Sequence, residues 1–272
     1  MNLLEKKMVE ALIDLRENHH VLGVKAEFEA EGTRFEEAIR LKEVVTRAGL
    51  DLTIKVGGCE AIKDMYEAKV VGISKIVAPM IETPYALKKY IHAVKMVFPE
   101  QEYHETKFYI NIETITGHEN FEAMMQSPEA KCLHGIVLGR VDMAGSIGLL
   151  REDINDNKIL NIAKDLSKKV KAYNMDLVIG GRVSAYSLPF FKELGEGMLD
   201  YFETRKIIFH APKALKDLNT DKGILKAVGF ELMWLKNKRD FYGMIFKEDE
   251  QRLAMLEYRY KELIKDAGGV YV

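Results

Sequence analysis

The feature that most constrains the fold is a regular alternation of short β-rich runs with longer amphipathic runs. It repeats about seven times with short connections, as in chains built from strand–helix units. Strands are expected at 21–28, 52–56, 75–78, 108–112, 135–138, 177–179 and 206–209. Helices are expected at 8–17, 34–47, 61–68, 84–97, 120–125, 158–173 and 188–194. Such alternation predicts a parallel sheet.

The length of the chain decides between the two common parallel architectures. At 272 residues, a closed (β/α)8 TIM-type barrel is favoured over an open doubly wound sheet. One strand of the barrel is unaccounted for, because either the eighth is poorly marked or the N-terminal segment is irregular. We expect residues 1–218 to form the barrel domain.

The C-terminal segment, 219–272, has a different pattern. Residues 222–242 and 248–264 are predicted to form two helices with no strand after them. These helices either cover the barrel of their own chain or reach a neighbouring subunit. The segment carries much apolar surface in Trp234, Leu235, Phe241, Tyr242 and Phe246. Because large apolar patches usually mark interfaces, a homo-oligomer held through these helices is expected.

Composition excludes several classes of protein. The formal net charge is −2, so there is no basic excess for binding nucleic acid. No apolar run approaches the roughly 20 residues that span a bilayer. The N-terminus lacks the apolar core of a signal peptide. Cys59 and Cys132 share no metal-type spacing and fit a reduced, cytoplasmic chain.

Polar residues follow several strands, at the end of a parallel barrel where active sites lie. In KFYINIETITGHENF, one strand face carries Asn111 and then Glu113, just before a turn at Gly117. The corresponding residues elsewhere are Glu27, Glu29, Lys55, Glu82, Arg140, Asp142, Arg182, Glu203 and Arg205. For Glu27, Glu29 and Glu203, a solvated loop charge is the simpler interpretation. That interpretation is weaker for Glu113 and Asp142, because each follows a strongly apolar strand and precedes a glycine-containing turn.

If Glu113 and Asp142 face each other across the barrel mouth, something positive must separate them. Two carboxylates about 4 Å apart repel by roughly 4 kcal/mol at an effective dielectric near 20. A hard cation such as Mg²⁺ or Mn²⁺ suits one or two carboxylates together with water and substrate oxygens. No His/Cys cluster is present, which argues against zinc.

The segment GRVDMAGSIG places Gly139, Gly145 and Gly148 in a predicted loop after a strand. Such a loop can direct backbone N–H groups at an anion. It is neither a G-x-G-x-x-G fingerprint nor a P-loop, so nucleotide binding is not expected.

Three segments, in this order, resemble the HpcH/HpaI aldolase and citrate lyase β-subunit family. They are IVAPMIETPYAL (76–87), INIETITGHENF (110–121) and HGIVLGRVDMAGSIG (134–148). The similarity covers roughly residues 50–210 and implies a (β/α)8 barrel of the pyruvate-binding type. It also implies that Glu113 and Asp142 bind Mg²⁺ or Mn²⁺, which chelates a 2-keto acid. Backbone amides near Gly139, Arg140, Val141 and Asp142 would hold its carboxylate.

The chain also departs from the family. Lys55 stands where the family has an arginine that stabilises the enolate. The histidine base of the family's aldolases has no counterpart in AEFEAEGTR, and Arg140 stands where a small or uncharged residue is usual. Nothing indicates acyl-CoA recognition, so a thioester substrate is not favoured.

The expected function is therefore that of a metal-dependent carbon–carbon lyase, an aldolase acting on a 2-keto acid and an aldehyde. Lys55 and Arg140 would add positive charge where an enolate forms. Arg182 and Arg205 would grip a distal carboxylate or phosphate, or else form surface ion pairs. The general base stays open among Glu27, Glu29, His118 and a metal-bound water.

Two alternatives remain at this point. The first is a Schiff-base aldolase that uses Lys55 or Lys25, which would need a lysine with a lowered pKa. The second is a catalytically inactive barrel that binds a ligand or a partner.

Overall fold

The computed structural model describes residues 1–99 and 105–270, which form two compact units. One unit comprises Met1–Glu231 and the other Leu232–Val272. Within the described residues no helix is both long and apolar enough to cross a membrane. Both cysteines are unpaired.

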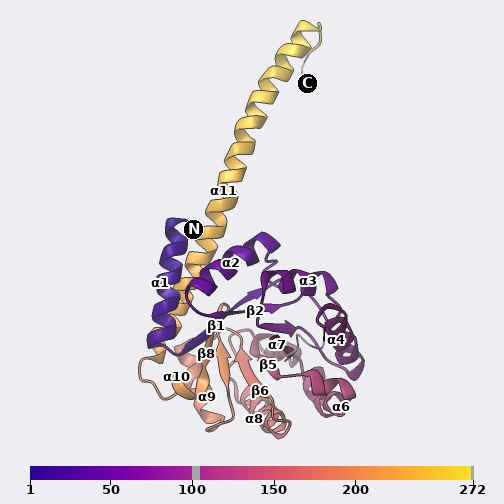
Figure 1. Cartoon of the computed structure of the whole chain (residues 1–272), viewed down its shortest axis with the longest axis vertical. Coiled ribbons are helices and arrows are strands. Elements are labelled where there is room, and N and C mark those ends of the chain that lie inside the picture. Colours follow the sequence, from indigo (N-terminus) through magenta and orange to yellow (C-terminus); the bar gives the residue numbers. More distant parts are fainter. Residues whose placement is uncertain (100–104, 271–272) are drawn as a thin grey trace. The chain divides into compact units, whose positions relative to one another are not determined.

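The first unit is a closed barrel of eight strands, which confirms the predicted fold class (Figure 1). The strands are β1 (Val21–Glu27), β2 (Asp51–Lys55), β3 (Lys75–Ala78), β4 (Lys107–Ile112), β5 (Gly135–Gly139), β6 (Asp176–Gly180), β7 (Tyr201–Glu203) and β8 (Ile207–His210).

Helices and short helical turns precede, connect and follow the strands. They are α1 (Leu3–Asn18), α2 (Phe35–Arg47), α3 (Ile62–Val71), α4 (Pro84–Val97), α5 (Ile115–Glu119), α6 (Phe121–Met125), η2 (Pro128–Cys132), α7 (Arg140–Ser146), α8 (Asn157–Ala172), η3 (Ala185–Ser187), α9 (Leu188–Glu193), α10 (Ala211–Ala214) and α11 (Thr220–Asp266). Most of the expected strands and helices are confirmed within a few residues, the usual uncertainty for element ends.

The last strand does not follow the parallel pattern that the sequence predicts. β1 to β7 are parallel, whereas β8 is antiparallel to both β7 and β1. Only a short turn separates Glu203 from Ile207, and a parallel crossover needs a dozen or more residues. β7 and β8 therefore form a hairpin, and the Thr204 N–H donates to Ile207 O at 2.9 Å.

The strand missing from the sequence prediction is β7. It is only three residues long, and polar residues follow it directly, so it shows no alternation over a useful length. The segment at 206–209 closes the barrel as β8, not as the seventh strand.

The strands divide their residues between two environments. On β4, Phe108, Ile110 and Ile112 are fully buried on one face, as the alternation predicts. The other face carries Tyr109, which packs in a small interior cluster with valines from β3, β5 and β6, and then Asn111. The polar side chains of this second face lead toward the carboxyl ends of the strands.

Two predicted segments fold differently. The predicted glycine loop after β5 begins as a helix, α7. The predicted pair of C-terminal helices is one continuous 47-residue helix, α11. No proline lies at the expected break, and an isolated glycine such as Gly243 costs a helix only about 1 kcal/mol.

Candidate active site

A cavity of about 750 Å³ lies at the carboxyl ends of the parallel strands. This volume is within the usual range for small-molecule sites. Seven of the eight residues that the sequence analysis placed in the site line the cavity. They are Lys55, Glu113, Gly139, Val141, Asp142, Arg182 and Arg205.

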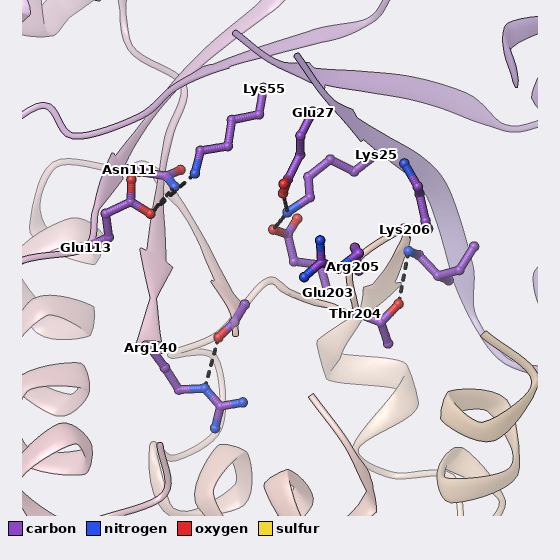
Figure 2. A network of polar contacts seen from close by, with 12 residues as sticks. Lys25, Glu27, Lys55, Asn111, Glu113, Arg140, Glu203, Thr204, Arg205 and Lys206 are labelled. Atoms are coloured by element: carbon purple, nitrogen blue, oxygen red, sulfur yellow. Dashed lines mark hydrogen bonds and ion pairs between the residues drawn. The ribbon is translucent and has the colours of Figure 1, made fainter. Parts of the chain in front are cut away.

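Lys25, near the end of β1, lies between two glutamates in the barrel interior (Figure 2). Its Nζ is 3.0 Å from Glu27 Oε1 and 2.5 Å from Glu203 Oε1. Burial alone would lower the pKa of Lys25, but the two carboxylates outweigh it and raise this pKa above its ordinary value. Lys25 is therefore a buried cation at neutral pH.

Lys55, at the end of β2, also lies close to two glutamates. Its Nζ lies 2.7 Å from Glu29 Oε2 and 3.5 Å from Glu113 Oε2. Burial would lower the pKa of Lys55, but Glu113 and Glu29 reverse the effect and raise it. Both cavity lysines that could form a Schiff base are thus protonated at neutral pH, whereas a nucleophilic amine needs a lowered pKa.

Besides Lys55, three neighbours hold Glu113 in place. Asn111 Nδ2 donates to Glu113 Oε2 at 2.7 Å, and the Met80 N–H donates to Glu113 Oε1 at 3.1 Å. The backbone of Gly139 packs against this carboxylate, since a Cβ on Gly139 would lie 2.7 Å from Glu113 Oε2. The glycine at the end of β5 therefore gives Glu113 the room to occupy this position.

The structure places the side chain of Arg140 outside the cavity, apart from the lysine network (Figure 2). Its Nε donates to Gly180 O at 3.0 Å, and its Nη2 donates to Gly181 O at 2.9 Å and Ser187 Oγ at 3.1 Å. Its Nη1 donates to Asn155 Oδ1 at 2.7 Å. These bonds turn the guanidinium toward the loop after β6, so Arg140 does not supply charge to the cavity in this arrangement.

Arg140 is also fully enclosed. Its guanidinium carbon lies 4.9 Å and 5.0 Å from the ring centroids of Phe190 and Phe191. Burial lowers the pKa of Arg140 to about 9, which leaves the side chain charged at neutral pH. Arg140 thus ties the start of α7, and with it Asp142, to the end of β6.

The loop after β6 supplies part of the cavity wall. Gly181 has φ +90°, and a Cβ there would lie 2.9 Å from Val141 N. Arg182 follows with φ +46°, a left-handed conformation that is uncommon for a residue other than glycine. Its side chain donates to Arg151 O at 3.3 Å. Arg205, in the β7–β8 turn, lies 4.0 Å from Glu31 Oε1 and is more than half exposed.

The donor set in the cavity fits a hard divalent cation. Glu113 and Asp142 line the same cavity, and Asn111 Oδ1 is buried with no hydrogen-bond partner within the described residues. Carboxylate and amide oxygens are the groups that Mg²⁺ and Ca²⁺ prefer. The described residues contain no group of three or more His, Cys, Asp or Glu that could hold a metal. Such an ion would therefore complete its coordination with water and substrate oxygens.

Besides Arg140, two other polar residues that the sequence analysis considered, Glu82 and His118, lie outside the cavity lining. Glu82 accepts a hydrogen bond from the Thr114 hydroxyl, and His118 pairs with Asp165 at 2.9 Å. His118 is therefore not placed to act as the base.

Several cavity residues did not emerge from the sequence. They are Lys25 in its role as a buried cation, Asn111, Arg151, Ser184, Thr204 and Glu231. Glu27 and Glu203, which the sequence favoured as solvated charges, are buried. The sequence placed Asn111 on the polar strand face that ends at Glu113 but assigned it no role in the site.

The fold is that of the family which the sequence resembles. A HpcH/HpaI aldolase/citrate lyase family protein from Burkholderia cenocepacia has a TM-score of 0.59 and 15% identity, covering 72% of this chain and 83% of that one. A HpcH/HpaI aldolase from Desulfitobacterium hafniense has a TM-score of 0.58 and 12% identity, covering 75% and 84%. No protein-family model and no curated protein matches the sequence.

A malate synthase from Haloferax volcanii, solved as a magnesium/glyoxylate complex, also has this fold. Its TM-score is 0.53 at 15% identity, and the match covers 73% of this chain and 65% of the malate synthase. Identities this low establish a shared fold, and a fold of this kind hosts many activities.

Proposed function

We propose that this protein is a divalent-metal-dependent carbon–carbon lyase, an aldolase that acts on a 2-keto acid through a pyruvate-type enolate. The observation that carries the proposal is the convergence of Glu113, Asp142 and Lys55 on one cavity at the carboxyl ends of the strands. The fold shared with aldolases and lyases supports it.

Glu113 and Asp142 would hold Mg²⁺ or Mn²⁺, with Asn111 Oδ1 as a further oxygen beside them. Bound there, the ion would act as a Lewis acid toward the keto oxygen of the substrate. Asn111 Nδ2 and the Met80 N–H fix the orientation of the Glu113 carboxylate through their hydrogen bonds. Such supporting contacts set both the direction and the basicity of a ligand.

Lys55 would stabilise the negative charge that develops on the substrate oxygen. Its pKa is raised, so it carries a full positive charge beside Glu113. A fixed, buried cation stabilises an enolate more strongly than the same cation would in water. Lys25 contributes a second positive charge deeper in the barrel, although two carboxylates already balance it.

Glu29 is the carboxylate best suited to accept the substrate proton. Glu27 and Glu29 both line the cavity. Burial would raise the pKa of Glu27, but Lys25 outweighs it and lowers this pKa, which makes Glu27 a weak base. The Glu29 side chain is 28% exposed and contacts Lys55, the group proposed to face the developing enolate.

Arg182 and Arg205 would select a substrate with a second anionic group, a carboxylate or a phosphate. Both line the cavity, and neither is buried. The second substrate would be an aldehyde. A cytoplasmic location also remains a prediction from the sequence.

The test is exchange of the methyl protons of pyruvate in D₂O, followed by NMR with and without Mg²⁺ or Mn²⁺. Enolisation is reported without knowledge of the aldehyde. Exchange that depends on the ion and is lost in Glu29→Gln supports the proposal. No exchange under any condition, with the ion bound, would contradict it.

The contact between Lys55 and Glu113 favours a second candidate, enolisation without an ion. The ammonium already neutralises this carboxylate, with 3.5 Å between Nζ and Oε2. In that case exchange would continue at the same rate in EDTA and fall in Lys55→Met.

A further inference from the structure

The Leu232–Val272 unit presents a regular apolar stripe along α11. Residues 232, 235, 242, 246, 253, 256, 260 and 263 are all leucine, tyrosine or phenylalanine. With Arg239 and Asp249 they form a series spaced alternately by three and four residues, which we name the seam. This is the heptad spacing of helices that pair in a coiled coil.

Most of the seam is solvent-exposed in the single chain, and Tyr242 is half-buried. Leu235 is 60% exposed, Phe246 63% and Leu253 54%. A long, mainly apolar stripe of this kind on a helix normally packs against another element. From Leu232 to Leu263 the helix is about 48 Å long, which is enough for several layers of paired side chains.

The two charged positions of the seam indicate what kind of surface the seam pairs with. Arg239 and Asp249 lie five residues before and five residues after Met244. We propose that the seam pairs with the same seam of a second copy of this chain, antiparallel, about a two-fold axis at Met244. Each Arg239 then lies opposite Asp249 of the other copy, so the charged layer forms twice.

The remaining layers agree with this register. The same two-fold axis sets Leu232 opposite position 256, Leu235 opposite position 253 and Tyr242 opposite position 246. Every one of these layers is apolar on both sides. A two-fold interface requires self-complementarity of this kind, in which each patch contacts its own copy.

The parallel alternative is disfavoured by the same two residues. In-register parallel helices would set Arg239 against Arg239 and Asp249 against Asp249. Like charges facing each other destabilise a coiled-coil layer and specify against that orientation. In the single chain, Arg239 Nη2 lies 2.6 Å from its neighbour Asp240, and both side chains are well exposed. No ion pair is formed by Asp249 with any residue in 1–99 or 105–270.

The experiment measures the oligomeric state of the full-length chain by sedimentation velocity over a concentration series. Leu253→Glu, on the seam, should raise the dimer dissociation constant by at least about tenfold. Ala254→Glu, an exposed position beside the seam, is the matched control and should leave it unchanged. Circular dichroism confirms that each variant keeps its helix content.

Charge exchange then tests the register. Arg239→Asp and Asp249→Arg should each raise the dissociation constant by at least about tenfold, and the double variant should return it close to the original value. A parallel pair gains nothing from the double exchange, since like charges still face each other. A monomeric parent chain, an assembly insensitive to Leu253→Glu, or a double variant as weak as the single ones would each overturn the proposal. The last result would indicate that the seam packs on the partner's barrel instead.

Discussion

Lys25 Nζ lies 2.5 Å from Glu203 Oε1, although the two residues are 178 positions apart in the chain. The contact joins the first strand of the barrel to the seventh. Because the Lys25 N–H also donates to Lys206 O at 2.7 Å, the same residue links β1 to the β7–β8 turn by its backbone. The barrel is thus closed by an ion pair as well as by backbone hydrogen bonds.

Glu203→Ala should lower the free energy of unfolding by about 3–5 kcal/mol, because it leaves a buried lysine with one partner fewer. Urea denaturation followed by circular dichroism measures the change. Glu196→Ala is the matched control, since Glu196 pairs with Lys216 at 2.7 Å on the surface and should show no measurable change. Equal effects in the two variants would mean that the Lys25–Glu203 pair does not stabilise the fold.

The stability that Glu27 contributes should disappear in acid. Burial would raise the pKa of Glu27, but Lys25 lowers it below the ordinary value of 4.5. A carboxyl with a lowered folded-state pKa stabilises the fold above about pH 4.5, and this stabilisation is lost as the pH falls through the folded value.

The measurement is the difference in unfolding free energy between the parent chain and Glu27→Gln, taken at about pH 6 and about pH 3.5. The difference should shrink at the lower pH. Lys25, whose pKa is raised, keeps its contribution below pH 10.5 and adds no change in this window. A difference that stays constant would show either that Glu27 keeps its charge at the lower pH or that this charge does not stabilise the fold.

Lys55→Met should slow ion-dependent deuterium exchange of pyruvate about 10²–10³-fold with metal binding intact, as expected when one donor to an oxyanion is removed. Lys55→Arg should retain much of the rate, because it keeps the charge near Glu113. Equal loss in both variants would favour a covalent role for the lysine, and no loss in either would place Lys55 outside the reaction.

Glu113→Gln and Asp142→Asn should each abolish tight Mn²⁺ binding, measured by calorimetry, because each removes one of two carboxylate ligands. Glu82→Gln is the control, since Glu82 also follows a strand but does not line the cavity. Unimpaired affinity in either ligand variant would remove that residue from the metal site.

Arg140→Lys should destabilise the fold by about 3 kcal/mol, because one ammonium cannot satisfy Gly180 O, Gly181 O, Asn155 and Ser187 together. Arg140→Lys should also lower the affinity for Mn²⁺, because Arg140 is a positioning residue that anchors the start of α7, where Asp142 lies. Lower stability with unchanged Mn²⁺ affinity would limit Arg140 to a structural role.

The barrel was predictable because its signals are local. Strands such as β3 and helices such as α4 are long enough for residue type and periodicity to show, and the sequence placed both correctly. The direction of β8 was not predictable in the same way. It depends on the shortness of the turn after Glu203, and β7 before it has only three residues.

The site also contains residues that the local sequence predicted and residues whose positions depend on distant partners. Glu113 and Asp142 were expected at the barrel mouth because each follows an apolar strand, and both line the cavity. The burial of Glu203 could not be predicted from the neighbouring residues, because its partner Lys25 is distant in sequence. The direction of the Arg140 side chain likewise depends on carbonyl groups about 40 residues away, at the end of β6.

The antiparallel last strand has a consequence for the order in which the chain folds. The β7–β8 hairpin is local and can form within about 1–10 μs. Closure of the barrel pairs Val21 with Phe209 and Val24 with Ile207, so it must wait until the ribosome has released that hairpin. At about 5–20 residues per second, β1 stays open on one edge for about 10–40 s. During that interval the inward charges Lys25 and Glu27 make the open edge a poor template for pairing with another chain.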